Sequence, residues 1–86
     1  MNIERIVWDL DDDPDGNVQH IAENGLTPDE VDEVLLTVDE IGASASFGLP
    51  IVFGFTSTGK HIGVVFQVIE EAPLAVRVVT AFETEF

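Results

Sequence analysis

The sequence predicts a single α+β domain, residues 1–86, in which one strand and two short helices precede an antiparallel β-meander. The hydrophobic period is about 3.6 residues in the first half of the chain and two residues after Gly42. A length of 86 residues fits one domain, which buries roughly 60–65% of the surface of its unfolded chain. The composition, 45% hydrophobic and 23% charged, indicates a packed core. We expect both helices to pack on one face of the sheet.

A first strand is expected over residues 3–8, where β-favouring side chains precede an acidic run. Trp8 should help to close the core. Within the acidic run Asp13 stands before Pro14, an order typical of a helix N-cap with proline at the first helical position. Gly25 offers the left-handed residue that ends a helix, and the apolar residues before it have helical spacing: Val18, Ile21 and Ala22.

The second helix has the clearest start signal in the chain. Residues 27–30, Thr-Pro-Asp-Glu, form a capping box with proline at the first helical position, and Leu26 and Val31 occupy the staple positions. The helix should end before Gly42. Its apolar stripe should face the core while its acidic residues face water; the stripe is Val31, Val34, Leu35 and Val38, and the acids are Asp29, Glu30, Asp32 and Glu33.

The second half of the chain alternates between two faces. Residues 51–56 and 62–68 form a predicted hairpin around a turn at 57–60, and a second turn at 70–73 leads to a last strand over 75–82. Residues 44–47 are a further candidate edge strand. Apolar residues occupy both phases of the last two strands, so either another element covers the second face or an exposed patch marks association, such as a homodimer through the sheet.

The charge of the chain restricts its partners. The formal net charge is −14, from seventeen acids against Arg5, Lys60 and Arg77, and thirteen of the acids lie in the first 41 residues. Such a field repels nucleic acid and anionic lipid, because duplex binding depends on lysine and arginine. RNA and membranes are therefore not expected as partners, and a basic protein partner is favoured. The alternative is that the charge serves solubility alone.

The cellular location is expected to be the cytoplasm. The chain has no cysteine, which fits a reducing compartment, and its start carries no apolar segment of the secretory type. Residues 41–59 are uncharged and have nearly the length of a membrane helix. Glycine, proline and hydroxyl residues interrupt this stretch, and its alternation favours two strands.

The acidic loop is similar in part to a calcium-binding loop. Asp11, Asp13 and Asp15 have the spacing of ligands in the D-x-D-x-D-G pattern, and Gly16 follows them. The twelfth position holds Ala22, where a bidentate glutamate is needed. A solvated loop before a helix is the alternative. No other cofactor is expected, since motifs for nucleotides and catalytic zinc do not occur.

Several stretches resemble the BrnT family of small type II toxins, and the likeness extends over most of the chain. It is carried by VWD at 7–9, ENGLT at 23–27, DEVDEVL at 29–35, GKHIGVVF at 59–66 and VRVVTA at 76–81. The resemblance implies a RelE-like ribonuclease fold with the order β-α-α and then a β-meander. It also implies messenger RNA as substrate, metal-independent phosphodiester cleavage by basic side chains, and a cognate antitoxin as partner.

This chain departs from the family where chemistry would occur. Family members typically have arginine directly after the Ser-Ala or Thr-Ala pair of the last strand, where this chain has Phe82. Cleavage must stabilise extra negative charge on the phosphorane and protonate the leaving oxygen. The candidates for these catalytic tasks are Lys60 and Arg77, at positions that are basic in the family, and His20 and His61. Alternatively, Lys60 is a turn residue, Arg77 pairs with a carboxylate, and the histidines are surface positions.

Three functional hypotheses follow. The leading one is a non-catalytic or weakly active relative of the BrnT toxins that acts as an acidic protein-interaction domain, motivated by Phe82 and the net charge of −14. The second is an active metal-independent ribonuclease toxin built on Lys60, Arg77, His20 and His61. The third is an acidic mimic that occupies the nucleic-acid site of another protein, suggested by the aspartate run.

Overall fold

The computed structural model describes residues 3–10, 12–37, 42–43 and 48–84. It contains two helices and a five-stranded sheet with the strand order β1-β5-β4-β3-β2. The elements are β1 (Arg5–Val7), α1 (Asn17–Glu23), α2 (Pro28–Thr37), β2 (Gly42–Ala43), β3 (Pro50–Phe55), β4 (His61–Glu71) and β5 (Leu74–Glu83). The α+β class and the order of a strand, two helices and a β-meander are confirmed.

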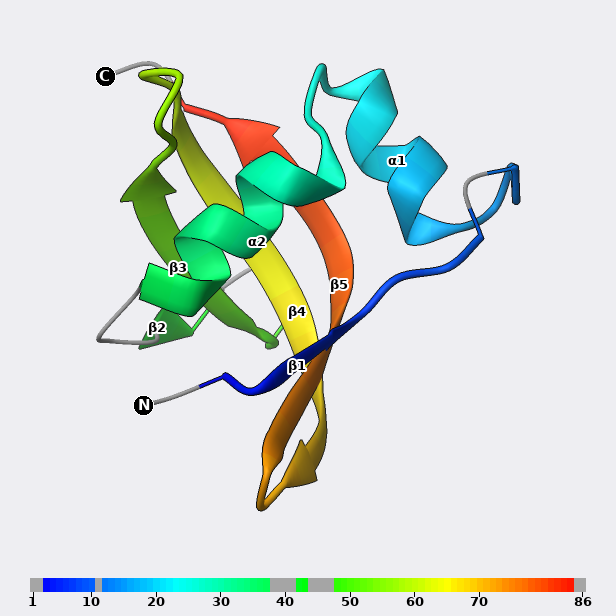
Figure 1. Cartoon of the computed structure of the whole chain (residues 1–86), viewed down its shortest axis with the longest axis vertical. Coiled ribbons are helices and arrows are strands. Elements are labelled where there is room, and N and C mark those ends of the chain that lie inside the picture. Colours follow the sequence, from blue (N-terminus) through cyan, green and yellow to red (C-terminus); the bar gives the residue numbers. More distant parts are fainter. Residues whose placement is uncertain (1–2, 11, 38–41, 44–47, 85–86) are drawn as a thin grey trace.

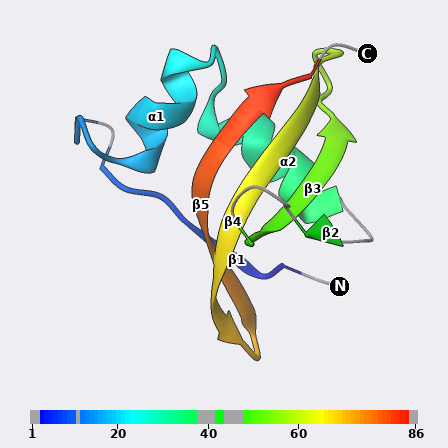
Figure 2. The ribbon, with the colours of Figure 1, turned by 180° about the vertical axis from the view of Figure 1, so that it is seen from behind.

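The sheet is mixed. Strands β3, β4 and β5 pair antiparallel, as predicted, whereas β1 pairs parallel to β5 with Arg5 opposite Ala75. In Figure 1 the helices lie in front of the sheet, with α2 over β3 and β4 and α1 beside β5. Seen from behind in Figure 2, the sheet lies in front of α2. The predicted packing of both helices on one face is thus confirmed.

Two boundaries in the strands differ from the predictions. The first strand covers only Arg5–Val7, shorter than the predicted 3–8. The second turn is also tighter, since β4 continues through Glu71 and β5 begins at Leu74. The candidate strand at 44–47 lies outside the described residues.

Helix α1 begins later than the predicted N-cap at Asp13 would require. Its N-cap is Gly16, and Asn17 is its first residue. The Asp13 carboxylate accepts a hydrogen bond from the Asp15 backbone N–H at 3.0 Å, and the Asp13 carbonyl accepts one from the Gly16 N–H at 3.0 Å. The N-cap prediction at Asp13 is wrong because this short side chain stabilises a local turn, which competes with helix formation.

Asn17 connects three segments at the start of α1. It is only 3% exposed. Its amide NH₂ donates to the Val7 carbonyl at 3.1 Å and to the Val78 carbonyl at 3.0 Å, and its amide oxygen accepts from the Asp9 N–H at 2.8 Å. The Asn17 N–H in turn donates to the Asp9 carboxylate at 2.8 Å. One buried side chain therefore joins the end of β1, the start of α1 and the middle of β5.

Helix α2 begins as its capping box predicts. The Thr27 N–H donates to the Glu30 carboxylate at 3.2 Å, and the Glu30 N–H donates to the Thr27 hydroxyl at 3.3 Å. Val31, Val34 and Leu35 are buried, as predicted from the stripe, and Val38 lies outside the described residues. The stripe packs on alternate residues of the sheet in one cluster, which includes Val52, Ile62, Val64, Phe66, Val76 and Val78.

Asp32 differs from the prediction that the acids of α2 all face water. Trp8 packs against the core, and its indole N–H donates to the Asp32 carboxylate at 2.8 Å. Burial raises the pKa of Asp32, the hydrogen bond from Trp8 opposes that effect, and the charge of Asp29 adds to it. The prediction is wrong for Asp32, which Trp8 partly covers, and also for Glu30, whose side chain is only 14% exposed.

The other face of the sheet carries large apolar side chains. Phe53 is 50% exposed and Phe55 is 61% exposed, although both belong to strand β3. We call the surface formed by Phe53, Phe55, His61 and Phe82 the open face. Its apolar character fits the prediction that the second face of the sheet is not polar.

No helix in the described parts of the chain is long and apolar enough to cross a membrane. The described portion of the uncharged stretch 41–59 contains strands β2 and β3. The prediction of strands in this stretch is therefore confirmed.

Asn17→Asp should destabilise the fold by about 3 kcal/mol, because the carboxylate cannot donate to the Val7 and Val78 carbonyls and places a charge in a buried position. Urea unfolding followed by circular dichroism measures the effect. His20→Ala, on the exposed side of the same helix, is the control and should stay within about 0.5 kcal/mol of the wild type. Equal stability of Asn17→Asp and the wild type would contradict the role of Asn17.

Asp32→Asn should stabilise the chain at neutral pH, because the amide avoids the burial of a charge and still accepts from Trp8. A raised pKa means that the folded wild type binds a proton more readily than the unfolded chain. Wild-type stability therefore recovers as the pH falls through the raised pKa, and the advantage of Asn should shrink to nothing below the ordinary pKa of aspartate. Urea midpoints of both proteins across this pH range measure the difference, and an advantage that persists in acid would refute the assignment.

Candidate functional site

The four predicted catalytic residues lie in different parts of the fold. Lys60 lies in the turn between β3 and β4, beside the start of α2. Arg77 lies on β5 and reaches toward the segment after β1. His61 lies on the open face, and His20 is exposed in the last turn of α1.

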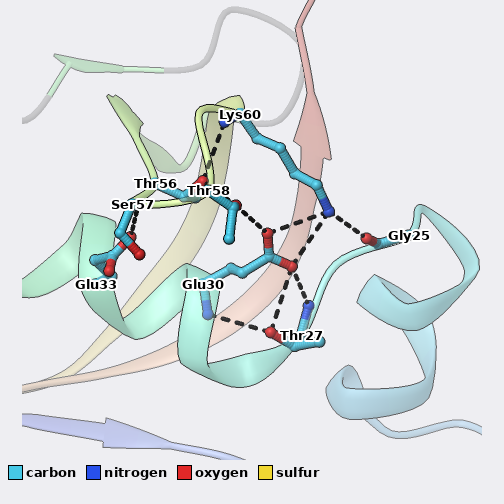
Figure 3. A network of polar contacts seen from close by, with 8 residues as sticks. All are labelled: Gly25, Thr27, Glu30, Glu33, Thr56, Ser57, Thr58 and Lys60. Carbon is cyan, nitrogen blue, oxygen red and sulfur yellow. Dashed lines mark hydrogen bonds and ion pairs between the residues drawn. The ribbon is translucent and has the colours of Figure 1, made fainter.

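The Lys60 ammonium is held at the start of α2. Its Nζ lies 3.1 Å from Oε2 of Glu30 and donates to the Gly25 carbonyl at 3.1 Å. The Thr58 hydroxyl donates to the same Glu30 oxygen at 3.2 Å. Figure 3 shows Glu30 between Lys60, Thr58 and the Thr27 cap, so one carboxylate both caps its helix and fixes the neighbouring turn.

A second carboxylate of α2 holds the other end of this turn. Glu33 accepts a hydrogen bond from the Ser57 N–H (Figure 3). Beneath the turn the buried Thr56 hydroxyl accepts from the Lys60 N–H at 3.1 Å. We call this set the helix–turn clamp; it consists of Thr27, Glu30, Glu33, Thr56, Ser57, Thr58 and Lys60. An open depression of about 430 Å³ is lined by most of its members and by Asp29.

The electrostatics of the depression oppose the binding of an anion. Burial acts to raise the pKa of Glu30, but hydrogen bonds from Lys60, Thr58 and the Thr27 backbone outweigh it, so the net pKa is lowered. Glu30 is thus ionised at neutral pH and neutralises Lys60. Asp29 and Glu33 add two further carboxylates to the lining. A phosphate approaching Lys60 would therefore meet more negative than positive charge.

Arg77 is held in a similar way on the side of the sheet where β5 pairs with β1. Its Nη2 lies 2.6 Å from Oδ2 of Asp9, the oxygen that also accepts from the Asn17 N–H. The Arg77 side chain is 38% exposed and that of Asp9 is 24% exposed. Arg77 therefore connects β5 to the start of α1, and its charge is balanced by Asp9.

His61 belongs to the open face. Its ring lies 4.7 Å from that of Phe55 and is stacked on that of Phe53, with the centroids 6.0 Å apart. Its Nδ1 is hydrogen-bonded to the Thr84 hydroxyl. These contacts place His61 on the face of the sheet opposite to the helix–turn clamp, although Lys60 is its neighbour in sequence.

The predicted calcium ligands are only partly described. Asp13 and Asp15 are exposed, and they are joined by the local turn at Asp13. Asp11 lies outside the described residues. Within the described ranges, no group of three or more histidine, aspartate or glutamate side chains could hold a metal ion. The calcium interpretation of Asp11, Asp13 and Asp15 therefore stays a prediction.

Sequence reasoning missed several of the residues that define this region. The sequence indicates Glu30 as part of a helix cap, yet nothing local indicates its pair with Lys60, thirty positions later. Asp9 and Glu33 appear in the sequence as ordinary surface acids. Their partners, Arg77 and Ser57, are distant in sequence, so no local pattern indicates these contacts.

Comparisons of the chain with protein-family models, with curated proteins and with solved structures gave no match. The resemblance to BrnT toxins therefore stays a prediction.

Glu30→Ala should destabilise the fold by about 1–2 kcal/mol at neutral pH, since it removes the carboxylate half of the capping box and the partner of Lys60. A lowered pKa means that the charged carboxylate stabilises the fold above its unfolded pKa, and that this contribution is lost as the pH falls through the folded pKa. The gap between variant and wild type should therefore narrow in acid. Urea unfolding at several pH values tests this, with the exposed Glu23→Ala as a control that should change little. A gap that is independent of pH would count against the role of the charge.

Proposed function

We propose that this chain is a small acidic protein-interaction domain without ribonuclease activity, related in layout to the BrnT toxins. The observation that carries the proposal is the open face, where Phe53 and Phe55 are at least half exposed. The order of a strand, two helices and a meander supports the proposed relationship. The partner would be a basic protein of the cytoplasm, for which a cognate antitoxin is the candidate that the resemblance implies.

The aromatic side chains of the open face have the properties of an interface centre. Contiguous apolar patches on small proteins commonly mark association, and aromatic residues are enriched at the centres of interfaces. The Phe53 ring packs edge-to-face on Phe82 with a centroid separation of 6.5 Å, and it stacks on His61. The rings are therefore supported by one another, which limits the loss of side-chain freedom on binding.

The two ion pairs support the absence of catalysis. A ribonuclease needs cations directed at the developing charge of the phosphorane. Lys60 and Arg77 are directed at Glu30 and Asp9 instead, so each would have to exchange a carboxylate for phosphate. The same negative charge that opposes RNA attracts a basic protein.

Phe53→Ser combined with Phe55→Ser should weaken capture of the partner by about tenfold or more, because aromatic anchors dominate interface energies. The tagged chain is incubated with extract of its native host, and the bound proteins are identified and quantified by mass spectrometry. Leu36→Ser, at an exposed position of α2, is the matched control and should retain the partner. Equal capture by the double variant and the wild type would contradict the proposed role of the open face.

Messenger RNA incubated with the purified chain in EDTA should remain intact. Cleavage that disappears in Lys60→Ala or Arg77→Ala would instead establish the ribonuclease alternative. Partner capture at several salt concentrations distinguishes the acidic-mimic alternative. A purely electrostatic complex weakens steeply as ionic strength rises and would not depend on Phe53.

A further inference from the structure

Strand β4 changes its environment halfway along its length. It has eleven residues, and its burial passes from a buried stretch, Ile62–Phe66, to five exposed residues, Gln67–Glu71. Val68 is 36% exposed and Ile69 is 48% exposed. In Figures 1 and 2 the β4–β5 hairpin extends past β3 and the helices. The strand therefore leaves the packed part of the sheet with apolar side chains still on it, and a register shift between Val68 and Glu70 leaves Ile69 as an extra residue on β4.

The register shows why, among the described strands, only β5 pairs with this segment. Pairing of β3 with β4 ends at Ile51 opposite Val65. Continuing the register would place Pro50 opposite Phe66, and proline has no N–H to donate. Before Pro50 the chain bends at Gly48, whose φ is +67°. Within the described residues, no strand lies beside Gln67–Glu71 on the β3 side, whereas β5 pairs along the other side.

The backbone groups of Val68 point toward this open side. The Lys60 carbonyl accepts from Thr56 on the β3 side, and the His61 carbonyl accepts from Thr84 on the β5 side. The backbone N–H and carbonyl groups of successive β4 residues thus point in turn toward β3 and toward β5. The register shift between Val65 and Phe66 adds its extra residue to β5, so the alternation of β4 continues unbroken from His61 to Val68. The second shift, between Val68 and Glu70, adds its extra residue to β4 beyond that point. Val68 therefore directs its N–H and carbonyl away from β5.

We infer that this edge, residues 67–71, binds an extended segment of a basic partner protein as an added strand. The inference rests on the proposed function for the charge of the partner and goes beyond it by naming a second surface. An open edge supplies backbone hydrogen bonds to a new strand, and pockets beside alternate side chains supply specificity. Val68 and Ile69 offer apolar contacts, while Glu70 and Glu71 face lysine or arginine of the segment.

The charge of the edge selects this occupant over a second copy of the chain. Pairing the edges of two copies would bring two sets of Glu70 and Glu71 together, on molecules that each carry a charge of −14. Like charges on facing strands are destabilising. A segment that carries lysine or arginine avoids this repulsion, because a cation on either face of the added strand lies beside one of the glutamates.

The test measures the binding of two labelled peptides of about eight residues to the whole chain by fluorescence anisotropy. One peptide alternates lysine with valine, and the other alternates glutamate with valine. Only the lysine peptide should bind. Val68→Pro, which removes the N–H of the edge, should weaken binding by about tenfold or more. Val68→Ala keeps this N–H and loses only part of an apolar contact, so it should weaken binding far less than Val68→Pro.

Two further measurements keep the inference testable if Val68→Pro folds poorly. Hydrogen exchange of the wild-type Val68 amide should slow when the lysine peptide binds. Charge reversal of Glu70 and Glu71 to lysine should abolish preference for the lysine peptide, whereas Glu23→Lys on α1, with the same kind of change at an exposed position, should preserve it.

Contrary outcomes separate the edge from the open face. Equal binding of the lysine peptide to Val68→Pro and to the wild type would overturn the inference. Loss of peptide binding in the Phe53 and Phe55 variant would assign the peptide to the open face, which overturns the inference and leaves the proposed function intact. A wild-type dimer that Val68→Pro dissociates would show that a second copy occupies the edge, which also overturns it. Binding of neither peptide would overturn the edge inference alone, because partner capture tests the open face independently.

Discussion

Ion pairs with the few basic residues of this protein hold the acidic first half of the chain to the sheet. Seventeen acids stand against three basic residues, and two of these bases connect the acidic first half to the sheet. Lys60 holds the start of α2 through Glu30, and Arg77 holds the segment before α1 through Asp9. Partly exposed ion pairs of this kind contribute modestly to stability. Each one nevertheless lowers the local repulsion where a negative element meets the sheet.

The glycines of the sheet make its two faces different. A Cβ on Gly54 would lie 3.0 Å from Cγ1 of Val34, so the absence of a side chain lets α2 approach β3 closely. A Cβ on Gly63 would lie 2.8 Å from the Phe53 ring and 2.9 Å from that of Phe82. Gly54 therefore lets α2 pack closely on one face of the sheet. On the open face, Gly63 lets aromatic rings lie against the strands.

The parts of the fold that could be predicted are those with local signals. The capping box at Thr27 and Glu30 located α2, and alternation located the hairpin around Lys60. The start of α1 could not be found from Pro14, because the Asp13 side chain stabilises a local turn instead of capping the helix. The helix begins at Asn17, whose side chain reaches the Val78 carbonyl, a contact between residues far apart in sequence. The parallel pairing of β1 with β5 has no local signature either. Likewise the candidate bases were identified by residue type, but their carboxylate partners depend on the tertiary arrangement.

Charge and exposed apolar surface have linked consequences in this molecule. Exposed rings such as Phe53 and Phe55 promote self-association, and the exposed end of β4 presents the same hazard through its backbone. A net charge of −14 opposes the approach of two copies, more strongly at low ionic strength. The same field increases the encounter rate with a positively charged protein. A small chain can thus expose an aromatic face and an open strand edge, since its charge disfavours its own copies and favours a basic partner.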